Sequence, residues 1–256
     1  MLQDCLRYRS LIRNLVLKDL KLKYRGSVLG VVWSLLRPLL LILVYTVAFK
    51  YVVRIRMENY AFFLLTGLLP WNFFSGAAMA STEAVRDNAN LIRKIYFPRA
   101  ILPMATVIFN FAQFLLALAV FLPLFFLWGA PAVSATLLCF PLVLMLHFLF
   151  TVGTALILSA VTSSFRDVSH LTEVGLVLLF WVTPIIYPVS MVPEAYQGLM
   201  KANPLAAFSI TYQDILFFGR FPDLWVQLAL VGWTLSVFWA GYRLFKWYEP
   251  FLAELV

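Results

Sequence analysis

The chain has 256 residues, of which 63% are hydrophobic and only 12% are charged, and its formal net charge is +8. A soluble globular domain carries about 25% charged residues, so this composition excludes an ordinary soluble fold of this length. Runs of about 20 apolar residues indicate membrane spans, and the sequence therefore predicts an all-α polytopic membrane protein. In such a protein a basic excess usually records topology, so we expect no nucleic-acid partner.

Residues 1–27 are predicted to form a cytoplasmic amphipathic interface helix. Leu11, Leu15 and Leu22 recur at helical spacing, and basic residues occupy the other faces. This pattern is typical of a helix that lies in the plane of the lipid headgroups. The alternative interpretation is a solvent-exposed helix that caps the membrane domain. The segment is too charged to contain the apolar region of a signal peptide.

Residues 28–256 are predicted to form a single transmembrane domain of six spans. We expect the spans at about 28–49, 61–80, 100–127, 132–161, 171–188 and 224–245. The fourth is longer than a bilayer requires, which indicates a tilted helix or a preceding interfacial piece. Between spans five and six lie apolar pieces too short to cross, separated by proline and glycine. They predict short re-entrant helices, with an ordinary extracytoplasmic loop as the alternative.

The distribution of lysine and arginine predicts the orientation. Fourteen of these residues fall on the side of the N-terminal tail, five fall on the other side, and Arg37 lies within span one. Because cytoplasmic loops carry the basic excess, both termini are expected in the cytoplasm.

The sequence lacks the motifs of several function classes. It has no GxxxxGK[ST] phosphate-binding loop, no HExxH motif and no CxxC pair. His147 and His170 are far apart in the sequence, so we expect no shared metal site. No carboxylate lies at the middle of a span, which disfavours a proton- or sodium-driven carrier. No catalytic, cofactor-binding or metal-binding residue is therefore predicted, and the energy for any transport is expected from another chain.

Aromatic residues and one arginine form a candidate substrate pathway. Aromatic residues make up 17% of the chain. The PWNFF stretch is expected to break span two, and FWVTPIIYP ends span five. Flat rings offer a rigid stacking surface for sugar rings, whereas an interfacial aromatic belt is the alternative. Arg37 would face the pathway or, alternatively, extend to the cytoplasmic surface. The candidate residues are Arg37, Trp71, Phe73, Phe74, Trp181 and Tyr187.

The loop between spans two and three contains the basic segment NLIRKIYFPRAILP. Its cations favour a cytoplasmic location, but topology alone does not require the apolar residues beside them. Those residues predict a short helix with one face for a partner protein, delimited by Pro98 and Pro103. The candidate contact residues are Asn90, Leu91, Ile92, Arg93, Lys94, Ile95, Tyr96, Phe97, Pro98 and Arg99.

Five pieces in order resemble the transmembrane subunit of type-2 ABC exporters that move polysaccharides, which include O-antigen, teichoic-acid and capsule exporters. The pieces are KYRGSVLGVVWSLLRPLL, NLIRKIYFPRAILP, SFRDV, WVTPIIYP and NPLAAF. The resemblance covers nearly the whole chain. It is closer to the O-antigen and teichoic-acid exporters than to the capsule exporters, and of the first two we favour O-antigen. Arg37 departs from it, because the resemblance implies a neutral residue before that proline.

The resemblance implies a homodimer in the bacterial inner membrane, docked on two copies of a separate ATPase that binds ATP and Mg²⁺. It implies a polysaccharide substrate carried on a lipid, and it identifies residues 90–99 as the segment that couples to the ATPase. A membrane enzyme acting on lipid-linked sugars is an alternative, with Asp167 or Glu173 as its acid. An ion pair or a partner contact explains these acids more simply, so Arg166 and Asp167 are candidate cytoplasmic contacts.

Overall fold

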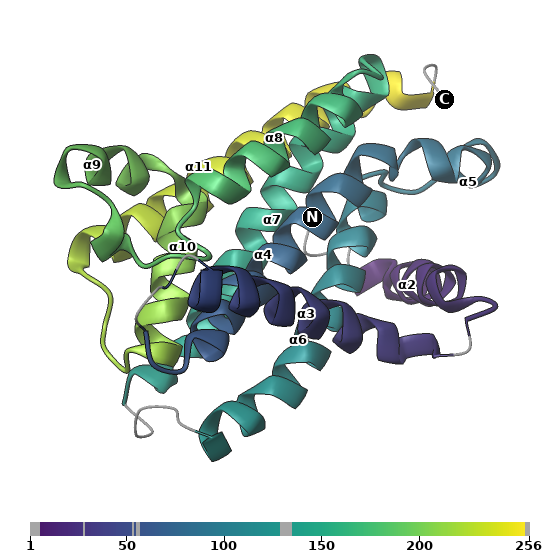
Figure 1. Ribbon diagram of the computed structural model, residues 1–256. Coiled ribbons are helices and arrows are strands. Elements are labelled where there is room, and N and C mark those ends of the chain that lie inside the picture. Colours follow the sequence, from purple (N-terminus) through teal and green to yellow (C-terminus); the bar gives the residue numbers. More distant parts are fainter. Residues whose placement is uncertain (1–5, 28, 53, 55–56, 129–134, 254–256) are drawn as a thin grey trace.

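The computed structural model describes residues 6–27, 29–52, 54, 57–128 and 135–253, and this part of the chain contains helices and no strands (Figure 1). The α-helices are α2 (Arg9–Tyr24), α3 (Trp33–Tyr45), α4 (Tyr60–Glu83), α5 (Ala89–Lys94), α6 (Ile101–Trp128), α7 (Phe140–Ser164), α8 (Val168–Val182), α9 (Glu194–Ala202), α10 (Pro204–Tyr212) and α11 (Leu224–Tyr248). Two π-helical segments, η2 (Thr46–Val52) and η6 (Gln213–Phe217), extend α3 and α10.

The predicted all-α polytopic membrane fold is confirmed. Four helical stretches are long and apolar enough to cross a membrane, namely Tyr60–Glu83, Ile101–Pro123, Ala135–Ser164 and Leu224–Tyr248. Shorter apolar helices cover Pro38–Val52 and Val168–Val182. A short 3-10 turn, Ala135–Cys139, precedes α7, and the predicted start of the fourth span at residue 132 lies outside the described residues.

Helix α4 is the centre of the bundle. In the most apolar 18 residues of α4, 67% of the residues are buried. The corresponding share in α11 is 22%, so α11 lies at the periphery. The prediction that PWNFF breaks this span is wrong, because α4 is continuous from Tyr60 to Glu83 with Pro70 inside it. A proline removes one helical hydrogen bond, and neighbouring helices in a membrane domain commonly compensate for that loss.

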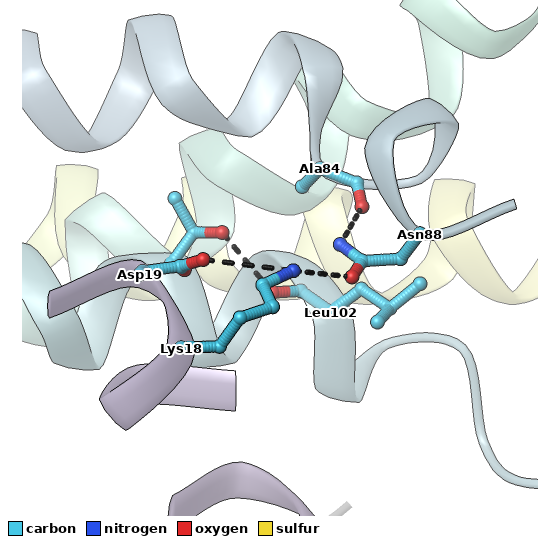
Figure 2. Close-up of polar contacts among 6 residues, drawn as sticks. Lys18, Asp19, Ala84, Asn88 and Leu102 are labelled. Carbon is cyan, nitrogen blue, oxygen red and sulfur yellow. Dashed lines mark hydrogen bonds and ion pairs between the residues drawn. The ribbon is translucent and has the colours of Figure 1, made fainter. Parts of the chain in front are cut away.

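The amphipathic helix α2 packs along α6 and buries Ile12 and Leu15. The Lys18 ammonium donates to the Asn88 side-chain oxygen at 2.7 Å and pairs with Asp19 at 3.6 Å (Figure 2). Burial raises the pKa of the Asp19 carboxyl above its ordinary value, although the Lys18 ammonium opposes that rise. Helix α2 is therefore part of the bundle, and its placement among lipid headgroups stays a prediction.

The chain unwinds after α8 and then forms the short helices predicted between spans five and six. Helix α9 is largely exposed, whereas α10 and η6 are almost wholly buried and contact α4, α7 and α11. The unwound stretch from Thr183 to Ile186 is itself buried. Its carbonyl groups do not accept helical hydrogen bonds, so other groups must donate hydrogen bonds to them in this apolar environment.

Side chains from two other elements satisfy this unwound stretch. The Tyr60 hydroxyl donates to the Ile186 carbonyl at 2.6 Å. Ser209 and Gln213 both donate to the Pro184 carbonyl, at 2.8 and 2.7 Å. These bonds join the end of α8 to the start of α4 and to the continuous helix formed by α10 and η6, and thereby fix the C-terminal end of α8.

The closest helix crossing is between α7 and α11, which make the most extensive contact of any two elements. A Cβ atom on Gly241 would lie 2.2 Å from the Gly153 carbonyl oxygen, and one on Gly153 would lie 2.6 Å from the Phe238 Cα. Both glycines are therefore required for the two backbones to approach this closely, as in other small-residue crossings in membranes.

Replacing Tyr60 by Phe should lower the free energy of unfolding by about 1–3 kcal/mol, because the buried Ile186 carbonyl would lose its donor. Thermal unfolding of the purified protein in detergent would measure this change. Tyr196→Phe, at an exposed hydroxyl on α9, is the matched control and should leave the transition unchanged. An unchanged transition in both variants would contradict the role of the Tyr60 hydroxyl.

Gly241→Ala should force α7 and α11 apart and lower the free energy of unfolding by about 1–3 kcal/mol. Gly232→Ala on the same helix is the control, because nothing lies within 4 Å of its Cβ position. Thermal unfolding in detergent, with yield of folded protein as a second measure, should separate the two variants. Equal unfolding transitions and equal yields for the two variants would contradict a close approach of the α7 and α11 backbones.

Candidate functional site

The first candidate site is the segment Asn90–Arg99, hereafter the coupling segment. It begins within α5, which ends at Lys94, and continues without regular secondary structure to Pro98. The predicted short helix is thus confined to Ala89–Lys94 and does not reach Pro98. The extended backbone of Ile95 agrees with this end, since its φ and ψ are −135° and 135°.

The coupling segment has an anchored side and an exposed side. Phe97 is only 5% exposed, and Leu91 and Ile92 pack against the hydrophobic core. Ile95 and Tyr96 are instead 54% and 94% exposed. Two exposed apolar side chains at a fixed position, beside two cations, are characteristic of a surface that contacts another protein.

A hollow of about 260 Å³ lies along the same segment. Its lining consists of Ile92, Arg93, Lys94, Ile95, Tyr96, Phe97 and Arg99. The hollow combines the basic residues with the exposed aromatic ring, so a partner side chain that enters it would meet both.

The end of the coupling segment is tied to the last transmembrane helix. The Arg99 backbone N–H donates to Glu249 Oε1 at 3.0 Å, and the Arg99 guanidinium donates to the Glu249 backbone carbonyl. The Lys246 ammonium pairs with Glu249 Oε2 at 2.8 Å. Arg99 is therefore an anchor of the segment, and Glu249 is a contact that the sequence did not predict.

The second candidate site is a groove of about 310 Å³ between α3, α4 and α8, hereafter the aromatic groove. Its lining consists of Leu41, Tyr45, Leu68, Trp71, Asn72, Ser75, Leu176, Val177, Phe180 and Trp181. The structure thus brings together Trp71 and Trp181, two of the predicted pathway residues. Rings lie close to each other along the groove, with centroids 5.5 Å apart for Trp71 and Phe180.

The chemistry of the aromatic groove suits an amphipathic polymer. Trp181 is 53% exposed, so its indole face is accessible from outside the subunit. Asn72 and Ser75 add hydrogen-bonding groups beside the rings. Sites that bind small molecules commonly combine an apolar, aromatic lining with a few polar groups that fix orientation.

Phe73 and Phe74 do not line the aromatic groove, although they belong to the same predicted set. They are 3% and 4% exposed and lie in the core. Phe73 stacks on Phe114 at 5.4 Å and meets the His147 ring edge-on at 5.0 Å. Phe74 lies beside Trp71, with ring centroids 6.2 Å apart, but it is buried against Phe150 on α7, so Phe73 and Phe74 both make the contacts of packing residues.

His147 is likewise part of the core. Its Nδ1 lies 3.2 Å from the Tyr212 hydroxyl, and its ring stacks on Phe208 at 4.5 Å. These contacts connect α7 to the buried helix α10, which is a packing role in accordance with its apolar surroundings.

Two further predicted pathway residues flank the groove. The Tyr187 hydroxyl donates to the Trp181 backbone carbonyl at 2.8 Å, which caps the end of α8. Arg37 lies on α3 one turn before Leu41, a lining residue, and its side chain lies outside the described part of the structure.

Arg166 and Asp167 form the exposed turn between α7 and α8. The Arg166 carbonyl accepts from the Ser169 hydroxyl at 3.0 Å, and Asp167 precedes the first residue of α8. The ion pairs found among the described residues do not include either side chain. Of the two explanations, an ion pair or a partner contact, the contact with a partner stays a prediction.

Sequence patterns missed the polar residues that hold these sites in place. Glu249 directly follows the last span, and an acidic residue beside the basic residues Arg243 and Lys246 was the signal that the sequence offered. Gln213 and Ser209 carried no signal of their own, because their partner is a backbone carbonyl of a distant segment.

Comparison with known proteins agrees with these features. Residues 10–217 match the family model described as ABC-2 type transporter. The O-antigen export system permease protein RfbA of Myxococcus xanthus is 34% identical over 258 residues, which cover 100% of this chain and 99% of the relative. An O-antigen export system permease protein RfbA of Klebsiella pneumoniae is 35% identical over 240 residues, with 93% and 92% covered. The polysialic acid transport protein KpsM of Escherichia coli is 26% identical over 241 residues, with 92% of each chain covered. The chain therefore belongs to the ABC-2 type transporter family and is a multi-pass membrane transport protein.

Proposed function

We propose that this protein is the permease subunit of an ATP-driven exporter that moves a lipid-linked polysaccharide, O-antigen in particular, across the bacterial inner membrane. In the active assembly it forms a homodimer with both termini in the cytoplasm, docked on two copies of a separate ATPase. The chain carries no cofactor of its own, and ATP and Mg²⁺ bind to the ATPase.

The coupling segment is the observation that carries this proposal. In this segment Ile95 and Tyr96 are exposed, whereas the buried Phe97 and the hydrogen-bonded Arg99 attach the segment to the bundle. A subunit that receives mechanical work from an ATPase needs such an exposed but fixed contact. The names of the relatives, which refer to export and transport, agree with this role.

The aromatic groove supports the choice of a polysaccharide as substrate. Sugar rings present C–H faces that stack on indole and phenyl rings, and such contacts do not demand a fixed register along a polymer. Val177, Leu178 and Trp181 leave the outer side of α8 apolar and exposed. That side could contact a second copy across the substrate path, which is consistent with a homodimer.

A capsule-type polymer is the second candidate substrate. The relative named for polysialic acid transport covers 92% of the chain, against 93% for the Klebsiella relatives, but at 26% identity against 32–35%. The lower identity favours O-antigen. Teichoic acid remains within the same class of lipid-linked polymers.

Arg93→Glu combined with Lys94→Glu should uncouple ATP hydrolysis from export. Reversal of two interfacial charges should lower polymer export by about tenfold or more, because charged contacts at an interface fix its register. Polymer transport and ATP hydrolysis would both be measured in proteoliposomes that contain the complex with its cognate ATPase.

The matched control for this pair is Arg93→Lys with Lys94→Arg, which keeps both charges. It should export at close to the original rate. Normal export by the charge-reversed variant, present at normal abundance, would refute the assignment of this segment to the ATPase contact.

Trp181→Ala should lower the rate of polymer export by about two- to tenfold, the loss expected when an aromatic stacking contact is removed. Trp225→Ala is the control, since this tryptophan is 62% exposed on α11 and lies outside the groove. Export rates normalised to the amount of assembled complex would test the difference. Equal rates for the two variants would argue that Trp181 belongs to an interfacial belt.

A further inference from the structure

The start of the coupling segment is fixed to the amphipathic helix α2. Asn88 directly precedes α5, and its side-chain oxygen accepts from the Lys18 ammonium at 2.7 Å (Figure 2). The Asn88 amide nitrogen in turn donates to the Ala84 carbonyl at 2.8 Å, at the end of α4. One side chain thus connects α2, α4 and the beginning of the segment.

The end of the segment is fixed to α11 by Glu249. This side chain accepts from the Arg99 backbone N–H and pairs with Lys246, and its backbone carbonyl accepts from the Arg99 guanidinium. Only 19% of the Glu249 side chain is exposed, so these contacts are partly shielded from water. Partial burial and a charge-assisted bond to a backbone N–H make this contact stronger than an ordinary surface ion pair.

The two contacts flank the coupling segment, one at Asn88, two residues before its start, and the other at Arg99, its last residue. Between them Ile95 and Tyr96 point outward, and Phe97 inserts into the core. In Figure 1 α5 lies on the same side of the molecule as the end of α11, opposite α9. A displacement at Tyr96 would therefore act on α2 through one end and on α11 through the other.

We propose that Asn88 and Glu249 are positioning residues that clamp the coupling segment to α2 and α11, so that movement of a docked ATPase is transmitted to the first and last helices of the bundle. This proposal rests on the proposed function, because it takes the segment to be the ATPase contact. The clamp itself exists in the permease alone and can be tested there.

Hydrogen exchange of the full chain in lipid nanodiscs, without any ATPase, tests the clamp. Glu249→Ala should speed amide exchange at residues 95–99 by about tenfold, because this stretch would open locally without its anchor. Glu249→Gln keeps an oxygen acceptor for the Arg99 N–H and should give an intermediate rate. Asn88→Ala should speed exchange at residues 89–94 instead.

The matched control is Glu194→Ala, which removes an exposed carboxylate from the start of α9, away from the segment. Its exchange at residues 89–99 should equal that of the original protein. If Glu249→Ala also leaves exchange at residues 95–99 unchanged, no clamp exists and the proposal is overturned.

The ratio of polymer exported to ATP hydrolysed, in proteoliposomes with the cognate ATPase, tests transmission. Glu249→Ala should lower this ratio by about fivefold or more while hydrolysis continues, with partial recovery in Glu249→Gln. A loss of folding alone would lower export and hydrolysis together and leave the ratio unchanged. Faster exchange with an unchanged ratio would refute transmission through Glu249.

These outcomes separate the clamp from the proposed function. Should the Arg93 and Lys94 charge reversal uncouple export while Glu249→Ala leaves the ratio intact, the segment contacts the ATPase and the clamp proposal fails. Should neither substitution alter the ratio, the assignment of the segment itself fails, whatever the exchange rates are.

Discussion

The architecture depends on hydrogen bonds to buried backbone carbonyl groups that are no longer part of a helix. Helix α8 ends at Val182, and the stretch that follows is buried, so its carbonyl groups need donors from elsewhere. Tyr60, Ser209 and Gln213 provide them from the start of α4 and from the continuous helix formed by α10 and η6. This constraint explains why α10 and η6 are buried against the bundle while α9 stays exposed, and it fixes the wall of the aromatic groove to which Trp181 belongs.

Helix α4 connects the two candidate sites. Trp71 lines the aromatic groove at its middle, and the helix continues to Glu83, shortly before α5 and the coupling segment. Twelve residues of α-helix span about 18 Å, and the continuity of α4 makes this distance rigid. Under the proposed function, movement at the coupling segment would therefore reach the groove through a single helix, α4.

Hydropathy predicted the long spans well, because a run of about 20 apolar residues is rarely compatible with any structure but a membrane span. Hydropathy could not predict which side chains of a span face the core and which face a groove. Helix α4 is apolar on all sides and mostly buried, so no periodic pattern distinguishes the groove residue Trp71 from the core residues Phe73 and Phe74. The same limit applies to Pro70, at which the sequence predicts a break that the helix does not show: whether a proline kinks a span depends on neighbours that sequence alone does not specify.

The contacts that hold the coupling segment were beyond sequence reasoning for a related reason. Lys18 and Asn88 are 70 residues apart, and Arg99 and Glu249 are 150 apart, so no local pattern relates them. The positive-inside rule predicts that all four lie on the cytoplasmic side, that is, on one face of the membrane, but it does not predict their contacts. Helix packing supplies the remaining information: α2 must lie along α6 and α11 must cross α7 at Gly153 before either pair can meet. The basic segment was recognisable from its composition, whereas the rigidity that would let it transmit force comes from the tertiary fold.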